Sequence, residues 1–170
     1  MLLGLATDLG GYAIMIGGTN GAHLTSFSLV DVTAHGRACG IMNPYYAVLF
    51  APSIEKHLRA IGACYAAADH MKKTGWESLS GRELAVAAAE GMMNFARSVG
   101  AETKLSEFPN FTPGHVTRAL TAAKDPQLKM KLQNMPMPMS SDQVDEYMGS
   151  VLEGAVTGDF SKVKTLPGHR

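Results

Sequence analysis

Apolar residues recur at helical spacing through much of the chain. One set lies at offsets of zero, four, seven and eleven, which is the spacing of a single helix face: Ile54, Leu58, Ile61 and Tyr65. A second stripe of this kind follows at residues 84–99: Leu84, Ala88, Met92, Phe95 and Val99. No segment alternates apolar and polar residues cleanly enough to indicate a strand. The pattern therefore predicts an all-α protein.

Capping signals predict where two of these helices begin and end. The segments Ser80–Glu83 and Ser140–Gln143 both have the pattern of a capping box, in which a serine accepts from a backbone amide and the fourth residue reaches back. Gly100 and Gly158 follow the two helices and are well suited to left-handed caps. We expect the first helix to end near residue 99 and the second near residue 157.

Prolines predict further boundaries. Thr112-Pro113 is typical of a helix start with proline in the first turn, and this helix should reach about Lys124. A short helix is expected from His35 toward Met42, with Pro44 just beyond it. Methionine and proline alternate within residues 134–139, which cannot be helical, so we expect a linker there.

The N-terminal segment is apolar on nearly every side from residue 2 to residue 16, which predicts a buried helix rather than a surface helix. Gly17-Gly18 should then form a turn. Thr19 or Asn20 can cap a following helix that runs to about Val32. Thr33-Ala34 is expected to interrupt the chain before the next helix.

Composition bounds the classes of function. A chain of 170 residues is expected to form one helical domain that spans residues 1–170. Charges are balanced at 15 of each sign, which argues against a nucleic-acid partner and against an electrostatic membrane anchor. The apolar segment at the start has no basic leader and is shorter than the roughly 20 residues that cross a bilayer. We therefore expect a cytoplasmic protein with neither a membrane nor a nucleic-acid partner.

The two cysteines, Cys39 and Cys64, lie among small and apolar residues and show no metal-type spacing. They are interpreted as buried free thiols in a reducing compartment.

The candidate chemistry lies between residues 17 and 46, where His23 and His35 stand twelve positions apart among small residues. On one straight helix they would lie about 18 Å apart, so they can share a metal only if the chain turns back near Thr33-Ala34. One interpretation is that both imidazoles face a common cleft, with His35 as a ligand and His23 as a ligand or a polar neighbour. The other is two ordinary histidines, one of them at a helix end.

This segment resembles the second metal-ligand stretch of the iron-containing alcohol dehydrogenases, a superfamily shared with glycerol dehydrogenase and dehydroquinate synthase. In that family an H-x-x-x-H run precedes a later histidine–glycine pair. His35 with Gly36 matches the later pair and is the implied metal ligand. His23 matches the second histidine of the run, which lies beside the substrate, and is the implied catalytic neighbour. Thr19 stands at the first place, where the family has a ligand that is lost here.

The resemblance covers about residues 2–160 and corresponds to the later part of the family's C-terminal helical domain. It implies reversible hydride transfer between an alcohol or aldehyde and NAD(P), with an iron or zinc ion polarising the substrate. The family's nucleotide-binding domain has no counterpart, and Gly17–Gly21 follows no strand, so we expect no cofactor site for NAD(P) here. The isolated chain would then be inactive and would pair with a chain supplying that domain, or form a homo-oligomer. The alternative is a non-catalytic helical binding or assembly module.

Overall fold

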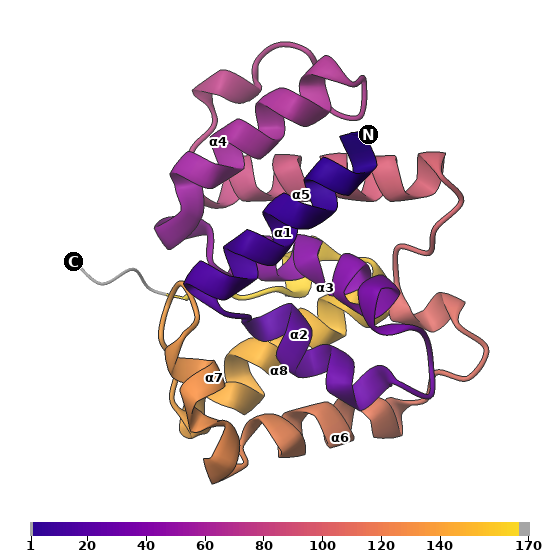
Figure 1. Ribbon diagram of the computed structural model, residues 1–170, viewed down its shortest axis with the longest axis vertical. Coiled ribbons are helices and arrows are strands. Elements are labelled where there is room, and N and C mark those ends of the chain that lie inside the picture. The colour runs from indigo at the N-terminus through magenta and orange to yellow at the C-terminus, as the bar shows by residue number, and fades with distance from the viewer. Residues whose placement is uncertain (1, 167–170) are drawn as a thin grey trace.

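The computed structural model describes residues 2–166, and within this range every regular element is helical (Figure 1). The all-α prediction is confirmed. The α-helices are α1 (Leu2–Gly17), α2 (Gly21–Ser26), α3 (His35–Leu49), α4 (Ala51–Ala67), α5 (Gly81–Ser98), α6 (Pro113–Ala123), α7 (Lys129–Gln133) and α8 (Val144–Thr157). Short 3-10 turns join them: η1 (Phe27–Leu29), η2 (Trp76–Ser78), η3 (Leu105–Glu107), η4 (Pro126–Leu128), η5 (Ser141–Gln143) and η6 (Phe160–Lys162).

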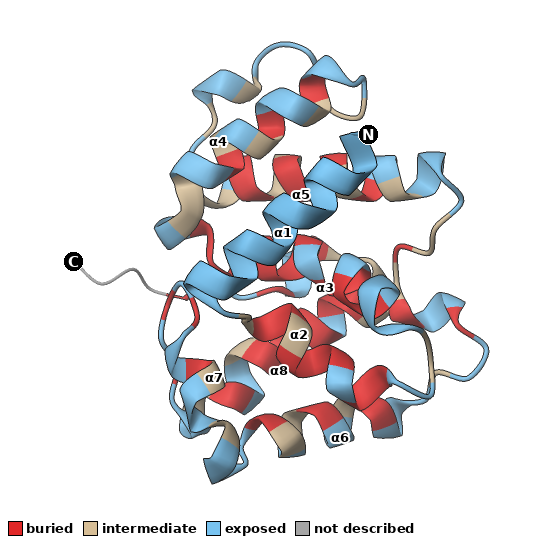
Figure 2. Ribbon diagram, in the orientation of Figure 1, coloured by how far each residue is buried: buried red, intermediate tan, exposed pale blue. Residues whose placement is uncertain are grey.

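Helix α3 is the centre of the fold, and it packs against α2, α5 and α8. Its side chains Met42, Tyr45 and Leu49 are fully buried, as are Met148 and Leu152 on α8. Figure 2 shows this distribution, with buried positions concentrated on α2, α3 and α8. Because α2 and α3 lie on one core, the side chains at their adjoining ends are held in fixed relative positions.

The prediction that a short helix ends before Pro44 is wrong, because α3 continues through this proline to Leu49. Proline has no amide hydrogen and therefore leaves the carbonyl of Gly40, four residues earlier, without its helical donor. Gly40 is exposed, so water can reach that carbonyl, while Pro44 itself is buried. Burial of the surrounding α3 side chains outweighs the cost of about 3 kcal/mol for an internal proline.

The start of α5 is where the sequence predicts it, but its cap comes from another helix. Ser80 makes no side-chain capping bond. Instead the amide of Gly81 donates to Glu55 Oε2 on α4 at 3.0 Å, and Arg59 holds Glu55 at 2.8 Å. Arg59 also donates to the carbonyl of Leu79 at 2.9 Å. The capping box of Ser140 with Gln143 is formed as predicted.

The glycine caps are confirmed. Gly100 and Gly158 both have left-handed backbone angles, with φ of 72° and 80°. The apolar stripe on α5 is only partly in the core: Leu84 is fully buried, whereas Phe95 and Val99 are 45% and 63% exposed. The exposure of the stripe therefore increases toward the C-terminal end of α5.

The N-terminal helix α1 contradicts the sequence interpretation most clearly. It forms where expected, but none of its residues is buried, and Leu3 and Ile16 are 81% and 88% exposed. Figure 2 shows α1 exposed along its whole length. Its attachment to the body includes a bond in which Asn134 Nδ2 donates to the carbonyl of Gly17 at 2.9 Å.

Within residues 2–166, none of the helices combines the length and the apolar character that spanning a membrane requires.

Residues 134–139 are non-helical, as predicted, but they are tightly packed. Met135, Met137 and Met139 are buried, and Pro136 and Pro138 between them are exposed. The amide of Met139 donates to the carbonyl of Leu132 at 3.2 Å. The segment contributes to the core that supports α7 and α8.

Candidate metal centre

The chain turns back between α2 and α3, and this turn brings the two candidate histidines together. Helix α2 is shorter than predicted, since it ends at Ser26 and continues only as η1 and a turn through residues 30–32. Ala34 is extended, with ψ of 146°, and α3 begins immediately after it at His35. The ring centroids of His23 and His35 lie 4.9 Å apart, edge to face. The break expected at Thr33-Ala34 is therefore present.

Cys39 is the third member of the cluster. It lies one turn after His35 on the same face of α3, and its Sγ is 3.8 Å from His35 Nε2. The candidate ligand atoms of His23, His35 and Cys39 all lie within 4.8 Å of one another. The interpretation that the cysteines lack metal-type spacing is wrong for Cys39, and Cys64 is exposed rather than buried.

The separations fit a tetrahedral metal ion after a small contraction. Bond lengths of about 2.05 Å to nitrogen and 2.3 Å to sulfur, at the tetrahedral angle, place the two ligand atoms about 3.6 Å apart. The observed separation of 3.8 Å between Cys39 Sγ and His35 Nε2 is close to this value. The three ligand atoms lie within 4.8 Å of one another, so side-chain movements of about 1 Å would bring them to tetrahedral separations.

Hydrogen bonds set the tautomer of His35. Ser26 Oγ donates its one proton to the carbonyl of His23 at 2.7 Å. At its second contact, 2.9 Å from His35 Nδ1, the hydroxyl must therefore accept, so Nδ1 carries the hydrogen. The lone pair of Nε2 then points at Cys39 Sγ. Orientation of a ligand imidazole by a bond at its other nitrogen is the usual arrangement in metal sites.

The electrostatic environment favours a neutral imidazole and a protonated thiol in the absence of a metal ion. Burial lowers the pKa of His23, and the nearby His35 and Lys131 lower it further. Burial raises the pKa of the Cys39 thiol. A metal ion that binds here must displace the thiol proton.

One side of the cluster faces solvent. Within the cluster, Cys39 is buried, His23 is half-buried and His35 is exposed. Phe27 stacks on the His35 ring at a centroid distance of 5.8 Å and is itself 56% exposed. Three protein ligands with solvent access on one side would leave a coordination position for water or a substrate.

Thr19 makes a different contact from the one its place in the family pattern suggests. Its hydroxyl accepts from Lys131 Nζ at 3.1 Å, and Lys131 is also close enough to His23 to affect its pKa. Asn20 is the N-cap of α2 but makes no side-chain capping bond. An ammonium group thus stands beside Thr19, where the family pattern has a metal ligand.

A buried contact fixes α2 against α3 just behind the cluster. Thr25 Oγ1 donates to the carbonyl of Gly21 at 2.8 Å, so the Tyr46 hydroxyl must donate to Thr25 Oγ1, at 2.7 Å. Burial raises the pKa of Tyr46 strongly, which keeps this hydroxyl a donor. The Tyr46 ring lies directly over Gly21 and leaves no room for a side chain there.

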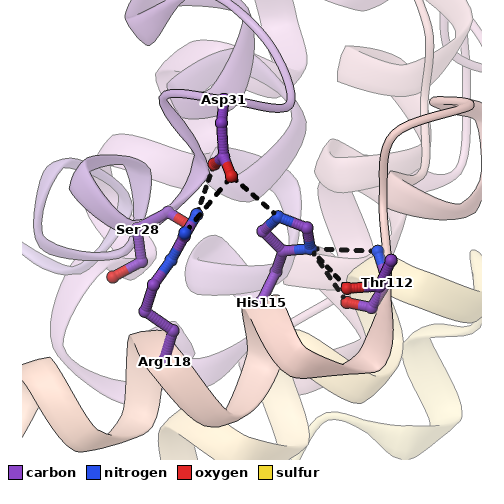
Figure 3. A network of polar contacts seen from close by, with 5 residues as sticks. All are labelled: Ser28, Asp31, Thr112, His115 and Arg118. Carbon is purple, nitrogen blue, oxygen red and sulfur yellow. Dashed lines mark hydrogen bonds and ion pairs between the residues drawn. The ribbon is translucent and has the colours of Figure 1, made fainter.

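A polar network fixes the other end of the turn (Figure 3). Asp31 forms an ion pair with Arg118 on α6, and Arg118 also donates from Nε to the carbonyl of Ser28 at 3.0 Å. His115 Nδ1 accepts from the amide of Thr112 at 3.0 Å, so Nε2 donates to Asp31 at 3.3 Å. The bond from Arg118 is the largest cause holding the pKa of Asp31 well below its usual range. The network ties the segment after η1 to α6.

The chain matches no protein-family model, no curated protein and no solved structure. The sequence pattern predicted His23 and His35 as members of the cluster but not Cys39. The one-turn spacing of His35 and Cys39 is nevertheless present in the sequence. The contacts of Ser26 and Lys131 had no sequence signal, because they depend on tertiary packing.

Proposed function

We propose that this chain binds a divalent transition metal ion, zinc or iron(II), through His23, His35 and Cys39. The observation that carries the proposal is that the ligand atoms of these residues lie within 4.8 Å of one another. Two imidazoles and one thiolate are donors that suit borderline metals. Ser26 supports the assignment, because it sets the tautomer that leaves His35 Nε2 free to bind.

The chemistry that such an ion supplies is Lewis-acid polarisation of an alcohol or carbonyl oxygen. The protein's own contribution is positional. Cys39 and His35 would occupy two coordination positions from one face of α3, and His23 would occupy the third from α2. Phe27 forms an apolar wall beside the exposed edge, which suits the carbon part of a small alcohol or aldehyde.

We further propose that the chain corresponds to the metal-binding helical part of an NAD(P)-dependent alcohol dehydrogenase of the iron-containing type. His35 keeps the ligand role that the resemblance implies, and Cys39 takes the place of the ligand lost at Thr19. Hydride transfer would also require a nucleotide-binding domain beside this helical part.

A non-catalytic binding or assembly role is the second candidate, and the position of Lys131 favours it. A fixed ammonium near His23 repels an incoming divalent ion, which is the opposite of what a metal centre under selection for tight binding needs.

Isothermal titration of the metal-free chain with zinc, and anaerobically with iron(II), tests the metal site. We expect one ion per chain, and at least a tenfold loss of affinity in His35→Ala and in Cys39→Ala. His57→Ala is the matched control, since His57 is an exposed imidazole on α4 outside the cluster. Equal affinities for His35→Ala and His57→Ala, or no binding by the unmodified chain, would overturn the proposal.

The dehydrogenase assignment has its own test. NADPH and NADH fluorescence titrations of the zinc-loaded chain should show no binding, because no strand precedes a glycine-rich phosphate loop within residues 2–166. Saturable binding of NADH or NADPH by this chain would contradict the dehydrogenase assignment. It would not affect the proposal of a metal site.

A further inference from the structure

Helix α1 is an apolar element that buries none of its residues against the rest of the fold within residues 2–166. The least exposed of its large apolar side chains, Ile14, is still 47% exposed. A Cβ added at Gly4, Gly10, Gly11 or Gly17 would meet no atom within 4 Å. These glycines therefore make no close packing contact with the residues that the structure describes.

The surface of α1 carries two adjoining stripes of different size. The large stripe has alternating spacings of three and four, as in a coiled-coil seam: Leu2, Leu5, Leu9, Tyr12 and Ile16. The small stripe lies directly beside it, with spacings of four, three and four: Ala6, Gly10, Ala13 and Gly17. A ridge beside a groove on one helix is self-complementary, because the ridge of one copy fits the groove of another.

The exposed area of the chain is large enough for a partner to cover part of it. The chain exposes 9422 Å². A compact monomer of this mass exposes about 8,100 Å², so the excess is roughly 1,300 Å². A standard protein interface buries about 800 Å² on each side, which is within this excess.

The charges on α1 favour a second copy of the chain over a lipid surface. Residues 2–17 contain no lysine or arginine, and the polar side consists of Thr7 and Asp8. Helices that lie in a membrane interface have an extended polar face, usually rich in basic residues. Asp8 projects beside Met15, away from the small stripe, so two copies can join through the stripes with their carboxylates outside.

We propose that α1 is a homodimerisation helix, and that two copies of this chain join by packing the large stripe of each α1 into the small stripe of the other. This inference does not depend on the metal site.

Sedimentation velocity and multi-angle light scattering on the full chain test the proposal. The unmodified chain should be a dimer at micromolar concentration, and Leu9→Glu should be a monomer with unchanged helical circular dichroism, because Leu9 is 59% exposed and outside the core of its own chain. Met15→Glu is the matched control, since it adds the same charge beside Asp8, and it should remain dimeric. A monomeric unmodified chain, or equal effects of the two variants, would overturn the proposal.

Gly10→Leu distinguishes groove packing from general apolar adhesion. The added side chain fills the groove, so dimerisation should weaken by at least about tenfold even though the helix becomes more apolar. Stronger association in Gly10→Leu would refute the groove. Monomeric protein that co-sediments with vesicles of zwitterionic or anionic phospholipid, and loses this in Leu9→Glu, would refute the dimer in favour of a lipid surface.

Discussion

Replacement of Gly21 by alanine should destabilise the fold and displace His23 from the proposed metal site. An alanine Cβ at this position would lie 2.1 Å from Tyr46 Cε1 and 2.5 Å from Cδ1 and Cζ. Ordinary carbon contacts begin near 3.5 Å, so the overlap is about 1.4 Å. The Tyr46 ring is buried and bonded through its hydroxyl to Thr25, and it cannot swing away. Helix α2 must move instead, and it carries His23.

The expected cost is that of overpacking, about 1–3 kcal/mol. For a domain of this length each kcal/mol lowers the melting temperature by about 2–4 °C, which gives a decrease of roughly 2–12 °C by differential scanning calorimetry. Gly36→Ala is the control. Gly36 is exposed on the first turn of α3, and no atom lies within 4 Å of the position that a Cβ would take. The melting temperature of this variant should be unchanged or slightly higher than that of the unmodified chain.

A double variant decides whether the cause is this contact. Tyr46→Leu removes the ring edge, so Gly21→Ala should cost clearly less in the Tyr46→Leu background than in the unmodified chain. Equal stability of Gly21→Ala and the unmodified chain, or purely additive effects in the double variant, would refute the reasoning.

Three further outcomes are expected. Lys131→Met should raise zinc affinity severalfold in a calorimetric titration, because it removes a cation near His23 while keeping the aliphatic stem. Zinc affinity should increase with pH through the neutral range, with proton release, because burial raises the pKa of Cys39 and the thiol must ionise to bind; a pH-independent affinity would exclude the thiolate. Asp31→Asn should lower the melting temperature near neutral pH, because it removes the ion pair with Arg118. This ion pair depresses the pKa of Asp31, so its contribution to stability is lost as acid protonates the carboxylate. The difference in melting temperature between the variant and the unmodified chain should therefore shrink below about pH 4.

Local signals predicted the helices well and their partners poorly. The start of α6 and the ends at Gly100 and Gly158 followed from residues that act within one turn of the chain. The start of α5 was also predicted correctly, although Ser80 does not form the predicted cap. The donor to Glu55 at the start of α5, and the passage of α3 through Pro44, depend on packing between helices. Such contacts leave no periodic trace in a sequence.

The site shows the same division. His23 and His35 were candidates because of their surroundings in the sequence, and the turn between them was placed correctly. Cys39 was not predicted as a ligand, because it has no second cysteine at the spacing of a metal site. Its position one helical turn after His35 is a weaker signal in the sequence. Helix α1 was interpreted as buried because an all-round apolar pattern indicates that a helix is covered, but not by which molecule.

The most direct test of the metal site is a titration of the metal-free chain with cobalt(II), followed by absorption spectroscopy. A thiolate ligand gives a sulfur-to-cobalt charge-transfer band in the near ultraviolet. The band should saturate at one ion per chain, disappear in Cys39→Ser and persist in Cys64→Ser, because Cys64 is exposed on α4 away from the cluster. Absence of the band in the unmodified chain, or its loss in Cys64→Ser with survival in Cys39→Ser, would contradict a site formed by His23, His35 and Cys39.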